Sequence, residues 1–268
     1  MAATASAGRL RQQLLDLGGL LLVCVLALQL FFVARIALMA AVDPQSTAFE
    51  RSEAWRLLRQ GQLGGQRPWK QQWVPETQLP RSLRQAVIAS EDANFAQHGG
   101  VEWDAIRSAW DRNRRAEARA EKANQLAEER AARAGKALDP ARQRVPKVVG
   151  GSTISQQLAK NLFLSGERTP LRKGQELVLT YLLEGLLDKR RILTLYLNHV
   201  ELGEGVFGAE AAARHYFRQG ASQLSPAQSA RLAVMLPAPK RFEKNPGSAY
   251  VSGRTASVLA RMAGADLP

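Results

Sequence analysis

The sequence has few of the residues that cross-link small domains or coordinate structural metals. Its 268 residues include one cysteine, Cys24, which excludes an internal disulfide and a zinc site made of several cysteines. Aromatic residues make up only 6% of the chain, which disfavours an all-β sandwich. No Gly-Lys-Ser/Thr sequence follows a strand pattern, so the chain is not a P-loop protein.

Acidic residues are also in the minority. The chain has 37 Lys and Arg residues against 24 Asp and Glu residues, and its formal net charge is +13. Such a surplus indicates an anionic partner, which could be nucleic acid, anionic lipid headgroups or a phosphorylated substrate. Nucleic acid is disfavoured, because the Arg-rich segment 111–147 has no interleaved aromatic residues for base stacking.

A long apolar segment near the N-terminus predicts a membrane anchor over residues 17–42. The segment contains one charged residue, Arg35, and roughly 20 apolar residues are enough to span a bilayer. A signal peptide and a buried globular helix are the alternatives, although a signal peptide has a shorter apolar core of about 7–15 residues. Arg9 and Arg11 precede the segment, so residues 1–16 are expected in the cytoplasm and the rest outside.

The remainder predicts a linker, 43–71, and a mostly α-helical domain, 72–268. The linker is rich in proline and glycine, with an amphipathic helix near 49–60, and an extended strand is expected at 72–75. Helix starts are predicted at Ser82, at Ser152 or Thr153, and at Ser225, which opens a capping box with proline next to it. Further helical patterns cover about 171–188, 190–200, 209–217 and 248–263.

Residues 111–147 differ in composition from their surroundings. Arg, Ala, Glu and Lys dominate, and large apolar residues are nearly absent. This is typical of a solvated helix or a mobile insertion, and the functional alternative is a basic surface near lipid headgroups.

Adjacent carboxylates, Glu91 and Asp92, close the helix expected from Ser82. Two like charges repel, so one carboxyl should have a raised pKa in an enclosed site and could act as a general base. A polar helix terminus is the alternative interpretation.

In segment 150–161, small residues precede the N-terminus of a predicted helix, whose free amides and dipole suit an anion. One face of that helix carries amides and a lysine, for which a solvated face is the alternative.

A third group combines Arg168, Arg172 and Lys173 with Glu176. Three cations so close could hold a pyrophosphate, because guanidinium groups match phosphate oxygens. The alternative is an ordinary surface ion pair between Arg172 and Glu176. Glu184 and Asp188, further along, have the pattern of surface residues.

Five segments resemble, in order, the motifs of the glycosyltransferase domain of class A penicillin-binding proteins and, more closely, of monofunctional biosynthetic peptidoglycan transglycosylases. Segment 90–98 resembles Glu-Asp-x-x-Phe-x-x-His, and 150–161 resembles Gly-Gly-Ser-Thr-Ile-Ser-Gln-Gln-x-x-Lys-Asn. Segments 172–176, 189–198 and 203–217 resemble the third, fourth and fifth motifs. Segment 111–147 is longer than expected for the family, and Thr194 stands where many members have Glu. No Ser-x-x-Lys or Lys-Thr-Gly is present, which supports a monofunctional protein.

The resemblance implies a lysozyme-like α fold behind one transmembrane helix, and polymerisation of lipid II with inversion at the anomeric carbon. It implies Glu91 as general base and Glu176 as second catalytic carboxylate, with a divalent cation (Mg or Mn) near Glu176 and no organic cofactor. The implied substrate-binding residues are Asp92, Phe95, His98, Ser152, Thr153, Gln156, Gln157, Lys160, Asn161, Arg168, Arg172 and Lys173.

The expected partners are lipid II, the growing glycan strand and membrane lipids, with other cell-wall synthesis proteins as candidates and no nucleic acid. The expected place is the cytoplasmic (inner) membrane, with the catalytic domain on its outer side. Three alternatives remain: a lysozyme-like peptidoglycan lyase or hydrolase, a non-catalytic cell-wall scaffold, and a nucleic-acid binder suggested by charge alone.

Overall fold

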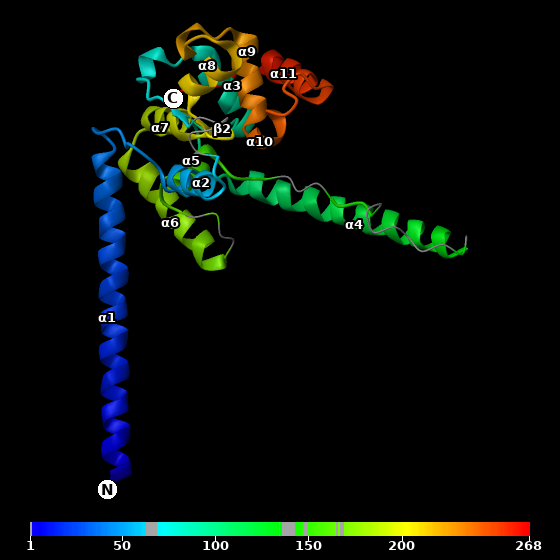
Figure 1. Ribbon diagram of the computed structural model, residues 1–268. Coiled ribbons are helices and arrows are strands. Elements are labelled where there is room, and N and C mark those ends of the chain that lie inside the picture. Colours follow the sequence, from blue (N-terminus) through cyan, green and yellow to red (C-terminus); the bar gives the residue numbers. More distant parts are fainter. Residues whose placement is uncertain are drawn as a thin grey trace.

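The structure is a computed structural model that describes residues 2–62, 69–133, 135, 143–146, 150–164, 166 and 169–268, with side chains from residue 12 onward. Figure 1 shows a long N-terminal helix, α1 (Ala2–Leu38), below a mainly helical body, and a second long helix, α4 (Trp103–Arg133), that projects from the body. The predicted mostly α fold is therefore confirmed.

The body combines short helices with a small sheet. Its helices are α2 (Ala48–Arg59), α3 (Arg81–Glu91), α5 (Ile154–Phe163), α6 (Pro170–Leu186), α7 (Lys189–His199), α8 (Ala209–Phe217), α9 (Pro226–Met235), α10 (Pro239–Phe242) and α11 (Ala249–Met262), with 3-10 turns η1 (Glu76–Gln78) and η3 (Ala221–Gln223). Strands β1 (Lys70–Gln71), β2 (Glu201–Gly203) and β3 (Val206–Phe207) pair in the order β1-β3-β2, with β1 parallel and β2 antiparallel to β3.

The strand predicted at 72–75 is wrong, because the pairing lies two residues earlier. Lys70 and Gln71 pair with β3, whereas Val74 bonds to a side chain. The Asn198 amide accepts from the Val74 N–H over 2.8 Å and donates to the Val74 carbonyl over 3.0 Å. Gly208, at the start of α8, lies so close that a Cβ there would be 2.4 Å from the Asn198 carbonyl oxygen, and its φ is +80°. This position therefore needs glycine.

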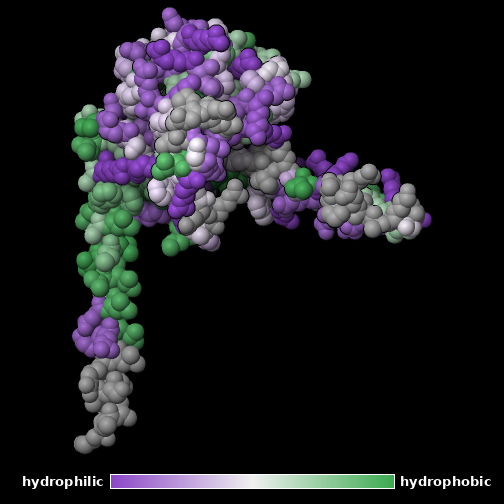
Figure 2. Space-filling model, in the orientation of Figure 1, coloured by the Kyte–Doolittle hydropathy of each residue, from purple (hydrophilic) through white to green (hydrophobic). Residues whose placement is uncertain are grey.

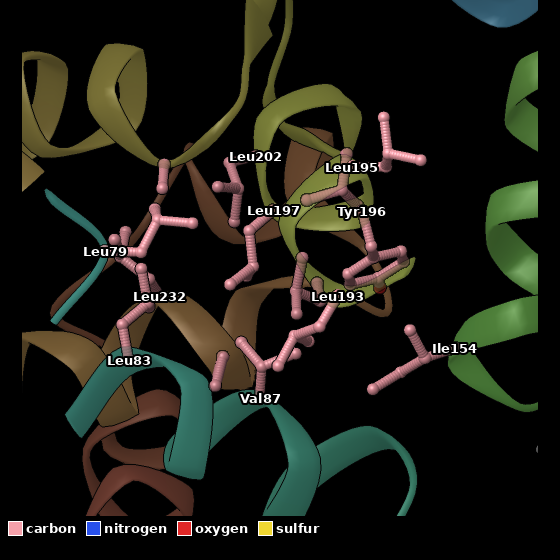
Figure 3. Close-up of a cluster of buried hydrophobic side chains, with 14 of the residues drawn as sticks. Leu79, Leu83, Val87, Ile154, Leu193, Leu195, Tyr196, Leu197, Leu202 and Leu232 are labelled. Carbon is pink, nitrogen blue, oxygen red and sulfur yellow. The ribbon is translucent and has the colours of Figure 1, made fainter. Parts of the chain in front are cut away.

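The core lies where α3, α5, α7 and α9 meet. Figure 3 shows Val87, Ile154, Leu193 and Leu232 converging from these helices, and all are almost fully buried. Tyr196, on α7, is also fully buried beside Ile154. Burial of such side chains contributes roughly 1.5–3 kcal/mol each and is the main force that holds the site helices together.

Most of the predicted helix starts are confirmed. Thr153 and Ser225 each form a capping box with a glutamine three residues later, and Ser248 caps α11. Such caps stabilise a helix by about 1 kcal/mol. The predicted start at Ser82 is wrong: α3 begins after Pro80, whose fixed φ suits a helix start. Ser82 lies inside the first turn and its hydroxyl contacts the Ser229 hydroxyl over 2.9 Å.

Helix α1 is long and apolar enough between Gln12 and Leu38 to cross a membrane. Figure 2 shows its surface as a hydrophobic band next to a hydrophilic zone. The helix ends at Leu38 and not at residue 42 as predicted. Residues 39–41 form turns and residue 42 a bend, and Pro44 disfavours a helical conformation at Asp43.

The last turns of α1 pack against the body. Ile36 and Met39 are buried in the core, and Phe32 packs edge-on against Phe163 of α5 with ring centroids 5.3 Å apart. Gln29 and Gln175 exchange two hydrogen bonds, of 3.1 and 3.3 Å, between α1 and α6. Helix α6 is therefore attached directly to the candidate membrane-spanning helix.

The charged segment predicted at 111–147 is helical in its first half, as a continuation of α4. Residues 111–133 extend a helix that starts at Trp103, so the expected solvated helix is confirmed for this part. Residues 134, 136–142 and 147–149 lie outside the described part of the chain.

Candidate active site

A cavity of about 310 Å³ lies between α2, α5 and the start of α6. It brings together residues predicted from two separate motifs. Its predicted lining residues are Ser152, Gln156, Gln157, Lys160, Arg172, Lys173 and Glu176, and it also contains Phe49, Leu164 and Gly166, which the sequence analysis did not single out. Phe49 comes from the amphipathic helix of the linker, so this segment forms part of the site.

The N-terminus of α5 is already neutralised by a carboxylate of the protein. Asp92 accepts the Ile154 N–H at 2.9 Å, and Thr153 and Gln156 bond to each other's backbone N–H groups in the capping box. All three side chains are buried. The expectation that free amides here bind an anionic ligand is therefore wrong for Ile154 and Gln156: Asp92 and the Thr153 side chain occupy those amides.

Asp92, Phe95 and His98 are not among the described lining residues of the cavity. The Nε2 atom of His98 lies 2.8 Å from Asp92, and its Nδ1 accepts the Gly100 N–H over 3.1 Å. Since Nδ1 accepts, Nε2 carries the proton and donates a hydrogen bond to Asp92. Phe95 is fully buried, with the Lys189 ammonium 4.5 Å from its ring centre. These contacts support a positioning role, and a direct contact of the three residues with substrate stays a prediction.

Glu91 is connected to the cavity through Gln157. The Gln157 amide donates to Glu91 Oε2 over 3.1 Å, and its oxygen accepts from the Tyr196 hydroxyl over 2.9 Å. Burial raises the pKa of Glu91 and the Asp92 charge raises it further, whereas hydrogen bonds from Gln157 and Ser90 oppose them. A carboxylate with a raised pKa is a stronger base than a solvated one, as a general base requires.

The start of α6 supplies cations to the cavity, and Arg172 and Lys173 form its cationic wall. Arg172 donates to Glu176 over 3.2 Å, and Lys173 forms an ion pair with the same carboxylate. Glu176 is only 3% exposed, which argues against an ordinary surface ion pair with Arg172. Lys160 of α5 also lines the cavity. Among the lining residues that the structure describes there are three cations and one carboxylate, a set suited to a multiply charged anion.

Like Glu91, Asp92, Phe95, His98 and Thr153, two further predicted residues are not placed among the lining residues of the cavity. Asn161 is largely buried on α5 and is not among the lining residues described. Arg168 lies outside the described residues, so its place in the cationic group stays a prediction. The start of α6 after it is fixed by Thr169, whose hydroxyl accepts the Arg172 N–H over 3.2 Å, and by Pro170 at the first helical position.

The residues present do not fit a resident divalent cation. The carboxylate of Glu176 is engaged by Arg172 and Lys173, and no second carboxylate is among the described residues of the cavity. A carboxylate cluster elsewhere, Asp92 with His98 and Glu102, also fails, because both ring nitrogens of His98 are used in hydrogen bonds.

Two features of the site were missed from the sequence. Tyr196 lies in the fourth motif, but its contact with Gln157 spans two helices and has no local signal. Glu184, interpreted as a surface residue, accepts from Ser155 of α5 and from Lys189, whose ammonium also donates to the His98 carbonyl over 2.6 Å. This chain of contacts ties α5 to the loop after α3. Asp188 is exposed as expected, and caps α7.

Comparison with known proteins agrees with this geometry. Residues 59–127 and 130–263 match the model of the transglycosylase family. The chain is 49% identical over 251 residues to the biosynthetic peptidoglycan transglycosylase of Burkholderia thailandensis, which covers 94% of this chain and 86% of that protein. It is 47% identical over 253 residues to the protein of the same name from Paraburkholderia xenovorans, covering 94% of this chain and 92% of that protein.

Proposed function

The chain belongs to the transglycosylase family, and we propose that it is a peptidoglycan glycosyltransferase that polymerises lipid II into glycan strands. Undecaprenyl pyrophosphate is the leaving group, and the anomeric carbon is inverted. The observation that carries the proposal is the arrangement of the cavity. Gln157 lines it and donates a hydrogen bond to Glu91, while Lys160, Arg172 and Lys173 line the same cavity together with Glu176.

In this mechanism, Glu91 accepts the proton of the sugar 4-hydroxyl of lipid II. The hydroxyl oxygen then forms a bond to the anomeric carbon of the growing strand, and the bond from that carbon to the pyrophosphate oxygen breaks. The negative charge that grows on the pyrophosphate is stabilised by Lys160, Arg172 and Lys173. Glu176 orients Arg172 and Lys173 and keeps them together before the substrate binds.

The attachment of α6 to α1 supports a membrane-bound substrate. Helix α6 carries both the cationic residues and Gln175, which bonds to Gln29 of the candidate span. The cationic wall therefore stays close to the level at which a lipid pyrophosphate leaves the bilayer. We infer a single-pass protein of the cytoplasmic membrane with its N-terminus inside and its catalytic body outside, as the positive-inside rule favours.

The test is polymerisation of labelled lipid II by the detergent-solubilised full chain, read as glycan polymer on a gel. We expect polymer from the parent and from Glu117→Gln, an exposed carboxylate on α4, and none from Glu91→Gln. Polymer from Glu91→Gln would contradict the role of Glu91. If neither folded protein makes polymer, preformed peptidoglycan separates the rivals: cleavage indicates a lyase or hydrolase, and no cleavage indicates a scaffold.

A further inference from the structure

Helix α4 contributes none of the described lining residues of the cavity, yet it is one of the longest elements. Its 31 residues give a length of about 46 Å. Figure 1 shows that it extends sideways from the body, across the direction of α1, near the level at which α1 meets the body. If α1 crosses a bilayer, a helix in this position runs along the membrane surface.

Basic residues are concentrated on one side of α4. Six of them recur at intervals of three, four or eight residues and therefore share that side of the helix. We call them the α4 basic stripe, which consists of Arg112, Arg115, Arg119, Lys122, Arg130 and Arg133. Every member is exposed, and Leu126, which is 44% exposed, fills the interval between Lys122 and Arg130.

The opposite side of α4 carries more acidic than basic residues. Glu117, Glu121 and Glu128 line a shallow groove there with the buried Ala120 and with Asn124, which exchanges hydrogen bonds of 3.1 and 2.7 Å with the backbone of Arg144.

The stripe side is basic but not free of carboxylates. Asp111 and Glu129 lie at its edge, and Glu129 pairs with Arg133 over 4.0 Å. The six cations of the stripe outnumber these two carboxylates, and this surplus of exposed positive charge suits an anionic surface.

We propose that the α4 basic stripe docks on the anionic phospholipid headgroups of the membrane that anchors α1, with Leu126 inserted among them. Lys and Arg are attracted to anionic leaflets only within about a Debye length, roughly 10 Å, so docking requires α4 to lie against the headgroups, as its position near the junction of α1 and the body allows (Figure 1). Docking would limit tilting of the whole protein, α1 included, and hold the cavity in one orientation above the bilayer. The inference rests on the proposed membrane anchor.

The test places a fluorophore on each side of α4 in the full chain. Cys24→Ser removes the native thiol, and Leu126→Cys or Glu128→Cys adds one label site on or opposite the stripe. Each protein is reconstituted in phosphatidylcholine vesicles or in vesicles that also contain phosphatidylglycerol, and iodide in the buffer quenches exposed label. We expect the label at residue 126 to be shielded only in the anionic vesicles, and the label at residue 128 to be quenched in both.

Matched charge variants identify the cause. Arg115→Gln with Arg119→Gln removes two members of the stripe, and Arg107→Gln with Arg114→Gln removes two arginines that lie outside it on the same helix. Stripe removal should lower the docked-to-undocked ratio by roughly 30-fold, at about fivefold per basic residue, and the control should not. Shielding in pure phosphatidylcholine, equal shielding of both labels, or equal loss in both variants would overturn the proposal. Flotation of the protein with the vesicles measures insertion of α1 separately. A protein that floats but shows no shielding lacks docking of α4, whereas a protein that does not float lacks the membrane anchor.

Discussion

The side-chain amide of Gln157 donates a hydrogen bond to Oε2 of Glu91 over 3.1 Å. The orientation of this amide is set by Tyr196, whose hydroxyl donates to the amide oxygen over 2.9 Å. Burial, with the charges of Glu91 and Asp92, raises the pKa of Tyr196 well above its ordinary value, so its hydroxyl remains a donor at every working pH. Two residues that do not react thus control the ionisation of the one that does.

Replacing Gln157 by Leu should therefore change the pH dependence of polymerisation. The hydrogen bond from Gln157 lowers the pKa of Glu91, so its loss raises that pKa further. Since Glu91 acts as a base only when ionised, the acid limb of kcat/KM against pH should move to higher pH. Tyr196→Phe should shift the limb in the same direction but by less. A slower enzyme with an unmoved acid limb would show that Gln157 only binds substrate.

Replacing Glu176 by Gln should separate stability from anion binding. The change removes the carboxylate that Arg172 and Lys173 share, so the free energy of unfolding should fall by roughly 1–3 kcal/mol. Inorganic pyrophosphate would then raise Tm more in the variant than in the parent, because it supplies the missing negative charge. Thermal unfolding in detergent, with and without pyrophosphate, measures both effects.

Glu184→Gln is the matched control for this experiment. Glu184 is also a largely buried carboxylate paired with a lysine, Lys189, but it does not line the cavity. It should lose stability without a stronger response to pyrophosphate. An identical pyrophosphate response in the Glu176 and Glu184 variants would place the anion site elsewhere.

The paired amides of Gln29 and Gln175 predict a measurable coupling between α1 and α6. Polar pairs between helices in a membrane contribute about 0.6 kcal/mol on average. Each single change to Leu should destabilise the protein, because it leaves the other amide without its partner. The double variant should lose less free energy of unfolding than the two single variants lose together. Unfolding free energies measured in the same detergent complete the cycle, and strict additivity would mean that the two amides do not interact.

Local signals explain how much of this structure could be predicted. The capping boxes at Thr153 and Ser225 and the apolar span each depend on residues within a few positions of one another, and the structure contains them. The cationic wall was predictable for a similar reason, since Arg172, Lys173 and Glu176 lie within one turn and a half of a single helix.

Long-range contacts explain what could not be predicted. Asp92 was expected to contact substrate, but it caps α5 through Ile154, 62 positions later in the chain. The strand near Val74 was misplaced because Asn198, 124 positions away, takes the place of a strand partner. No local pattern reports which distant group satisfies a buried carboxylate or a backbone amide, so these roles emerge only in the folded chain.

The last prediction concerns a buried carboxylate outside the site, Glu201 of β2. Burial, aided by the charge of Glu53, raises its pKa from 4.5 to about 7, although Lys240 and Arg56 oppose the shift. Between these pH values the folded state holds a proton that the unfolded state has released, so the free energy of unfolding falls as pH rises from 4.5 to 7. The loss amounts to roughly 3 kcal/mol at pH values above this window. Glu201→Gln cannot ionise, so it should unfold at a higher temperature than the parent at about pH 8 and show no such gain at about pH 5. The control Glu117→Gln, on the exposed side of α4, should unfold at the same temperature as the parent at both pH values. If Glu201→Gln also unfolds at the parent's temperature at both pH values, Lys240 keeps the Glu201 carboxylate ionised throughout.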